Sequence, residues 1–94
     1  MLSEKEFVDR AFAIAARMAD EPEWAYHIKS VDATYIRCKS KKNLCAVKLG
    51  RMYPEILKCE PTKKYANPII KAATNNQWCV NVPMREIVRR ILLA

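Results

Sequence analysis

The segment TYIRCKSKKNLCAVKLGR (residues 34–51) alternates apolar and polar side chains, which is typical of β-strands with one buried and one exposed face. The pattern predicts one strand over residues 34–40 and a second over residues 44–50, joined by a short turn. The side chains expected on the buried face are apolar: Ile36, Cys38, Cys45, Val47 and Leu49. Because so short a connection joins antiparallel neighbours, the segment predicts a β-hairpin at the centre of the fold.

Further strands are expected on both sides of this hairpin. Residues 24–31 (WAYHIKSV) also show a period of two, with Tyr26 and Ile28 on the buried side. Residues 55–60 are flanked by prolines and predict a short edge strand, and residues 77–82 predict a last strand. An exposed edge strand at either end would allow the sheet to pair with a second copy of the chain, giving a homodimer.

Helices are predicted near both ends of the chain and once within it. Ser3 and Glu6 fit a capping box, and apolar residues at helical spacing follow over residues 4–19. Residues 68–74 predict a short helix that begins with a proline. Residues 83–94 (PMREIVRRILLA) predict a closing amphipathic helix, with apolar side chains on one side and arginines on the other.

These elements predict a single domain over residues 1–94 with an α+β fold. The expected architecture has two layers: a mainly antiparallel sheet of four to five strands, with the N-terminal and C-terminal helices packed on one face. No apolar run approaches the length of a membrane span. The N-terminus, MLSEKEFVDR, lacks the basic start and apolar stretch of a secretory signal. We therefore expect a cytoplasmic protein, with the nucleus as the alternative location.

The chain has one glycine, Gly50, which excludes several classes of binding site. A phosphate-binding P-loop needs two glycines and a dinucleotide fingerprint needs three, because only glycine lets backbone N–H groups come so close to phosphate. Two common RNA-binding signatures, those of the KH and RRM domains, also require glycines that this chain lacks. These glycine-dependent classes are therefore excluded.

The cysteines and the single histidine show no spacing typical of a metal or catalytic site. Zinc sites normally present close cysteine pairs, and none occurs among Cys38, Cys45, Cys59 and Cys79. We expect these thiols to be small buried side chains in a reducing compartment, with two disulfides in a secreted form as the alternative. His27 lacks a recognisable catalytic partner. The sequence therefore predicts a protein without catalytic residues, metal or cofactor, and not an enzyme.

Charge is unevenly distributed along the chain, whose net charge is +7. Residues 1–23 carry three basic and six acidic side chains, a net −3, whereas residues 24–94 carry fourteen basic and four acidic ones, a net +10. A basic surplus of this size favours a polyanionic partner, such as nucleic acid, an acidic protein surface or an anionic membrane surface. The acidic first helix would alternatively cover part of the basic surface.

The exposed face of the predicted hairpin combines cations with an aromatic ring. Proteins that read single-stranded or looped RNA use this combination, because the ring stacks on a base while the cations contact phosphates. The expected contact residues lie on that face or its adjoining loops: Tyr35, Arg37, Lys39, Lys41, Lys42, Lys48, Arg51, Lys58, Lys63 and Lys64. The competing interpretation is that lysine merely fills the wet face of an ordinary sheet and protects its edges.

Two functions follow from this sequence as expectations. The first is a small basic nucleic-acid-binding protein, with RNA favoured over DNA. The second is a non-enzymatic protein-interaction, adaptor or inhibitor module that binds an acidic partner surface, for instance as a subunit of a larger assembly. Its support is a surplus of large apolar and aromatic side chains for so small a core, since such residues anchor interfaces.

Overall fold

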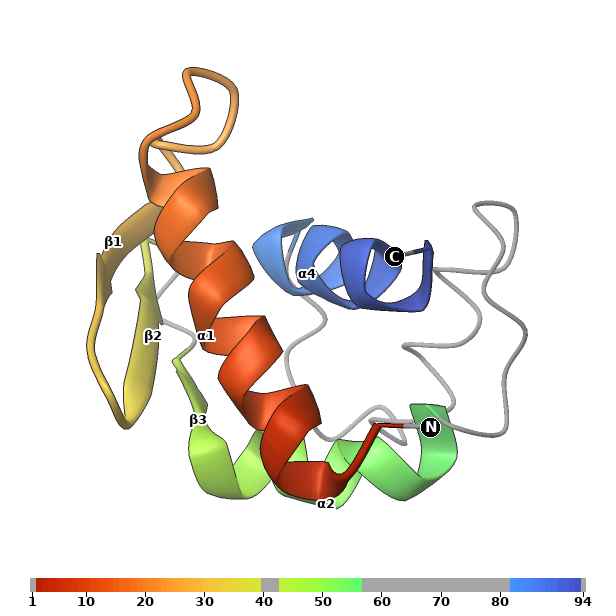
Figure 1. Cartoon of the computed structure of the whole chain (residues 1–94). Coiled ribbons are helices and arrows are strands. Elements are labelled where there is room, and N and C mark those ends of the chain that lie inside the picture. Colours follow the sequence, from red (N-terminus) through yellow and green to blue (C-terminus); the bar gives the residue numbers. More distant parts are fainter. Residues whose placement is uncertain (1, 40–42, 57–81, 94) are drawn as a thin grey trace.

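Helices and strands follow one another along the chain in an α+β arrangement (Figure 1). The computed structural model describes residues 2–39, 43–56 and 82–93. The described residues form three helices and three strands: α1 (Glu4–Ala19), β1 (Ile28–Val31), β2 (Tyr35–Cys38), β3 (Leu44–Cys45), α2 (Ala46–Ile56) and α4 (Val82–Leu93). The predicted α+β class is therefore confirmed.

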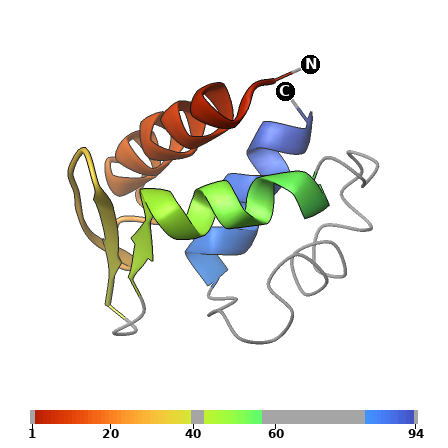
Figure 2. The ribbon, with the colours of Figure 1, turned by 90° about the horizontal axis from the view of Figure 1, so that it is seen from below.

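The strands form an antiparallel sheet in the order β1-β2-β3. Its register pairs Ile28 with Cys38 and Ile36 with Leu44, and all four side chains are buried on one face. Figures 1 and 2 show the sheet at one end of the molecule, with α1 across its inner face and with α2 and α4 beside α1. The opposite face of the sheet is turned toward solvent.

The first helix has the bounds and the cap that its sequence predicts. The Ser3 hydroxyl accepts a hydrogen bond from the Glu6 backbone N–H at 3.1 Å, and the Glu6 carboxylate accepts one from the Ser3 N–H at 3.2 Å. Asp20 ends the helix, its N–H bonding back to carbonyls of the last turn. The buried stripe follows helical spacing: Phe7, Ala11, Ile14, Ala15 and Met18. The predicted helix over residues 4–19 is confirmed.

A single cluster of buried side chains joins α1 to the sheet and to both other helices. Its members are apolar side chains from α1, the inner sheet face, α2 and α4: Phe7, Ala11, Ile14, Ala15, Met18, Ile28, Ile36, Cys38, Leu44, Leu49, Met52, Met84, Ile87, Val88 and Ile91. The Tyr53 hydroxyl donates a hydrogen bond to the Leu2 carbonyl and so ties α2 to the start of α1. The predicted closing helix is confirmed. It corresponds to α4, which begins one residue earlier than expected and supplies four members of the cluster.

The predicted strand over residues 44–50 is wrong beyond its first two residues. The strand ends at Cys45, and α2 begins at Ala46. As a result, Val47 is 63% exposed instead of buried, while Leu49 and Met52, three residues apart, are both buried. Burial at helical spacing follows from packing against α1, which the alternation in the sequence does not reveal.

Gly50 lies buried inside α2, where it allows a close approach to α1. A Cβ atom at this position would overlap Oε1 of Glu4, the first residue of α1. The missing side chain therefore leaves room for the Glu4 carboxylate between the two helices. Pro54 also lies within α2, close to its last residue, Ile56. Both residue types disfavour helix, and the tertiary contacts of α2 override them here.

The predicted strand over residues 24–31 is wrong in its first half. Tight turns occupy this region, with hydrogen bonds from the Trp24 N–H to the Glu21 carbonyl and from the His27 N–H to the Trp24 carbonyl. The strand begins only at Ile28. Because the chain before it is not extended, Tyr26 is 71% exposed and does not point inward beside Ile28.

The three described strands are fewer than the four to five expected. The strand predicted over residues 55–60 is wrong at its start, because Glu55 and Ile56 belong to α2, and its remainder lies outside the described residues. The predicted helix over residues 68–74 also lies outside them, as does the strand over residues 77–82 except Val82, which begins α4. None of the helices in the described part combines the length and apolarity needed to cross a bilayer.

Candidate nucleic-acid interface

The hairpin of β1 and β2 is closed by a turn around Asp32. One oxygen of its carboxylate accepts hydrogen bonds from the Thr34 N–H at 2.8 Å, the Tyr35 N–H at 2.8 Å and the Thr34 hydroxyl at 2.9 Å. These bonds, led by those from the backbone, lower the pKa of Asp32 below its ordinary value. The Asp32 N–H also donates to the Tyr35 carbonyl at 2.9 Å. The turn thereby fixes where β2 begins and which way Tyr35 points.

The side chains of β2 alternate between the core and solvent. Ile36 and Cys38 are buried, whereas Tyr35, Arg37 and, just beyond the strand, Lys39 are exposed. The Lys39 N–H bonds the His27 carbonyl at 3.1 Å, which extends the pairing of the two strands by one step. The predicted strand over residues 34–40 is thus confirmed from Tyr35 to Cys38, and its exposed residues share one face.

Two exposed tyrosines lie beside cations on this face. The Lys39 ammonium lies 4.5 Å from the centre of the Tyr26 ring, and the Arg37 guanidinium lies 5.9 Å from the centre of the Tyr35 ring. Both distances are within the range of cation–π attraction. Tyr26 is further held edge-on against His27, with ring centres 5.5 Å apart. Each ring therefore has a fixed neighbour and still presents exposed surface, 71% for Tyr26 and 43% for Tyr35.

A β-bulge brings a third cation to the same place. The register of β1 against β2 shifts between Ile28 and Ser30, so Lys29 is the extra residue of the bulge. Lys29 is exposed and lines a shallow depression of about 730 Å³. The described residues that line this depression are Lys29, Arg37, Cys38, Lys39 and Asn43. Three of them are cations, and none carries a carboxylate. We call Tyr26, Lys29, Tyr35, Arg37 and Lys39 together the basic face.

The structure divides the ten contact residues predicted from the sequence into three groups. Tyr35, Arg37 and Lys39 lie together on the basic face. Lys48 and Arg51 do not join them through a strand, because both lie on the exposed side of α2. The others lie outside the described residues: Lys41, Lys42, Lys58, Lys63 and Lys64.

Tyr26 and Lys29 also lie on the basic face, although neither is among the ten contact residues predicted from the sequence. The pairing of Ile28 with Cys38 explains both additions, because it brings the residues around Ile28 next to Lys39. The alternation over residues 24–31 predicts Tyr26 on the buried side, which is wrong, and Lys29 on the exposed side, where it does lie. Placing both residues on the basic face requires the register between β1 and β2, which the sequence does not give.

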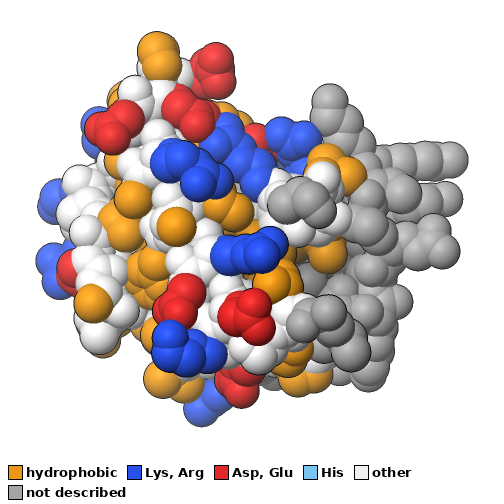
Figure 3. All heavy atoms as spheres, in the orientation of Figure 1, with side chains coloured by type: hydrophobic (Ala, Val, Ile, Leu, Met, Phe, Trp, Pro, Cys, Tyr) orange, Lys and Arg blue, Asp and Glu red, His pale blue; other side chains and the backbone are white. Residues whose placement is uncertain are grey.

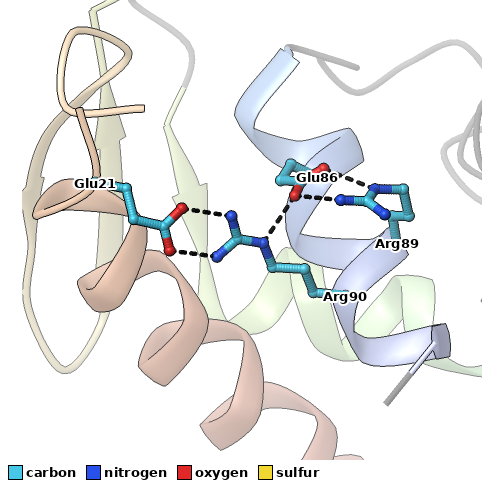
Figure 4. Close-up of polar contacts among 4 residues, drawn as sticks. All are labelled: Glu21, Glu86, Arg89 and Arg90. Atoms are coloured by element: carbon cyan, nitrogen blue, oxygen red, sulfur yellow. Dashed lines mark hydrogen bonds and ion pairs between the residues drawn. The ribbon is translucent and has the colours of Figure 1, made fainter. Parts of the chain in front are cut away.

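A second group of charges lies away from the basic face, between α4 and the turn after α1 (Figure 4). Arg89 donates to Glu86 from Nε at 2.7 Å and from Nη2 at 2.5 Å. Arg90 donates to Glu86 from Nε at 2.8 Å and to the two oxygens of Glu21 from Nη1 at 2.7 Å and Nη2 at 2.5 Å. The charges of two arginines from residues 24–94, the part of the chain with a net charge of +10, are therefore neutralised within the fold.

The pKa values in this group follow from its contacts. Glu86 is 9% exposed, and its burial raises its pKa, but the hydrogen bonds and charges of Arg89 and Arg90 outweigh this and hold the pKa below its ordinary value. The hydrogen bond from Arg90 likewise lowers the pKa of Glu21. The pKa of Arg90 is raised above its ordinary value, first by the hydrogen bond to Glu21 and then by that to Glu86. All four groups are therefore charged at neutral pH.

No protein-family model matches the chain, and neither a curated protein sequence nor a solved structure matches it. Among the described residues, no group of three His, Cys, Asp or Glu side chains is placed to hold a metal ion. Of the cysteines in this part of the chain, Cys38 is buried and Cys45 is partly buried.

Replacing Asp32 with alanine should loosen the hairpin that presents Tyr35. The substitution removes the acceptor of three hydrogen bonds, so we expect the melting temperature to fall by a few degrees. Asp32→Asn is the matched control, because its amide oxygen can accept the same bonds. Thermal unfolding followed by circular dichroism measures both, and equal melting temperatures for the wild type and Asp32→Ala would contradict the role of the turn.

Proposed function

We propose that this protein binds single-stranded RNA through the basic face. The observation that supports the proposal most strongly is the pairing of two exposed tyrosines with cations beside a depression lined by Lys29, Arg37 and Lys39. Stacking on an aromatic ring requires a base that is free of its duplex partner, so the ligand is expected to be single-stranded. Cations next to each ring suit the phosphates that flank a stacked base.

Cation–π contacts leave the rings usable for stacking. A cation occupies one side of a ring, and the high exposure of Tyr26 leaves most of that residue open to solvent. The neighbouring cation also restricts the rotation of the ring, which reduces the entropy that a bound base would otherwise cost. Stacking of one base on an aromatic side chain contributes about 1–3 kcal/mol. The two tyrosines therefore supply a substantial part of the expected affinity.

Fluorescence anisotropy with a labelled oligouridylate tests the proposal. Three phosphate contacts, one for each cation of the basic face, predict that log K falls with log salt with a slope of about −2 or steeper. Arg37→Glu with Lys39→Glu should weaken binding by at least about tenfold at low salt, because attraction becomes repulsion at the centre of the face. Tyr26→Ala and Tyr35→Ala should each weaken it by roughly fivefold or more.

The matched control is Arg10→Glu with Arg17→Glu, which changes the net charge equally. Both arginines are exposed on α1, outside the basic face. Equal losses in the two double variants would mean that only net charge matters, and would overturn the assignment to the basic face. Absence of salt-dependent binding to RNA would overturn the function itself and favour an acidic protein partner. The cytoplasmic location and the lack of enzymatic activity stay predictions from the sequence.

A further inference from the structure

A second depression lies along the seam between α1 and α4, on a different part of the surface. Its volume is about 260 Å³, and it is lined by Arg10, Ala13, Ile14, Arg17, Arg90 and Ile91. Figure 3 shows blue basic side chains with orange hydrophobic atoms between them on the face where α1 and α4 are turned toward the viewer. The combination of an apolar floor and a basic rim distinguishes this seam from the basic face.

The three arginines of the seam do not contribute equally. Arg90 donates hydrogen bonds from Nε to Glu86 and from Nη1 and Nη2 to Glu21 (Figure 4). Its charge is therefore compensated, and its side chain is held in place. Arg10 and Arg17 make no ion pair within the described part of the chain. The positive charge of the seam that no described ion pair engages therefore comes from α1, where Arg10 lies near Glu6 and Arg17 near Glu21.

The spacing of Arg10 and Arg17 is that of two helical turns. Seven residues along an α-helix advance by about 10.5 Å, so the two guanidinium groups lie on the same side of α1 with Ala13 and Ile14 between them. A second helix lying against α1 would place residues seven apart opposite these arginines. Carboxylates are the preferred partners, because the guanidinium group binds them through two parallel hydrogen bonds.

The volume of the depression favours an anchoring side chain over a free ligand. Sites for cofactors and drug-sized molecules usually enclose about 300–1,000 Å³, and this depression is smaller. Its floor is formed by the buried Ile14 and Ile91, whose apolar surface suits an aliphatic side chain. A short side chain at Ala13 leaves the entrance open. These features match the way in which an amphipathic helix docks into a groove.

We propose that the α1–α4 seam binds an acidic amphipathic helix of a partner protein. The helix inserts one leucine-like side chain between Ala13 and Ile91, and two of its carboxylates, seven residues apart, pair with Arg10 and Arg17. The site is separate from the basic face, so the proposal holds whether or not the protein binds RNA. It also gives a use to the depression between α1 and α4, whose floor is apolar.

A synthetic helical peptide tests this proposal. The probe is a fluorescein-labelled, alanine-based peptide with two glutamates seven residues apart and two leucines between them, and its anisotropy is measured against the full chain. We expect saturable binding, and we expect Arg10→Ala with Arg17→Ala to raise the Kd by at least about tenfold. Ala13→Phe should also raise the Kd by about tenfold, because it fills the depression from an exposed position.

Three controls separate this result from general electrostatic attraction. A peptide with glutamine in place of both glutamates should bind at least about tenfold more weakly. Ala16→Phe, an equally exposed change on α1 outside the depression, should leave the Kd within about twofold. At physiological salt, which screens charges beyond about 8 Å, Arg37→Glu with Lys39→Glu should also leave the Kd within about twofold. Absence of saturable binding, or equal effects of Ala13→Phe and Ala16→Phe, would overturn the proposal.

Discussion

Replacing Phe7 with alanine is expected to lower the free energy of unfolding by about 3–5 kcal/mol. Phe7 is 1% exposed, and it projects from the first turns of α1 into the core. Its ring also contacts the Tyr53 ring of α2, with centres 5.6 Å apart. The substitution removes these contacts and leaves a cavity between α1 and α2. Because domains of this size are stable by only about 5–15 kcal/mol, much of the protein would unfold on mild heating.

Urea unfolding followed by circular dichroism measures this effect, and Phe12→Ala is the matched control. Phe12 lies on the same helix but is only partly buried at the border of the core. The same change of side chain should therefore cost clearly less at Phe12 than at Phe7. Equal losses at the two positions would contradict the orientation of α1 described above.

Replacing Glu86 with glutamine is expected to lower the free energy of unfolding at neutral pH by about 2–4 kcal/mol. The Glu86 carboxylate accepts three hydrogen bonds from Arg89 and Arg90 while almost fully buried. The amide of glutamine would place an N–H donor against guanidinium donors. Arg89 and Arg90 would keep their charges without this acceptor, and α4 would be held less firmly against α1.

The same variant should change how stability depends on pH. The pKa of Glu86 is lower in the folded protein than in the unfolded chain, where it is about 4.3. The stabilisation is therefore complete above that value and is lost as the pH falls through the folded pKa. Between about pH 5 and pH 3, we expect the melting temperature to fall less steeply in Glu86→Gln than in the wild type.

An exposed ion pair provides the comparison for Glu86. Lys5 and Asp9 of α1 are 2.8 Å apart, and both side chains are largely in solvent. Asp9→Asn should change stability by less than about 0.5 kcal/mol, since exposed pairs contribute little. If Asp9→Asn and Glu86→Gln were equally destabilising, burial of the group around Glu86 would not be the reason for its effect.

The elements that the sequence predicted well are those whose signals are local. The capping box of Ser3 and Glu6 and the apolar stripe that follows lie within one helix, and so does the stripe of α4. Residues 46–50, predicted as strand, belong to the helix α2. This stretch carries two patterns at once. Cys45, Val47 and Leu49 alternate as in a strand, and Gly50 and Pro54 argue against a helix, so only packing against α1 decides.

The candidate sites show the same limit. The alternation of Tyr35, Arg37 and Lys39 predicted their common face because it belongs to one strand. Tyr26 and Lys29 join that face through turns and a β-bulge, which depend on how two strands pair. The bond between Glu21 and Arg90 joins residues 69 positions apart, so no local pattern indicates it.

The contacts between α1 and α4 also have a consequence for how the chain acquires its fold. During synthesis, α1 leaves the ribosome before α4, and the side of α1 that contacts α4 stays uncovered until α4 is made. Contacts between such distant segments form slowly, since the chain must close a long loop before gaining them. The nascent chain therefore exposes Ile14, which lies beside Ile91 of α4, to aggregation or chaperone binding until α4 emerges.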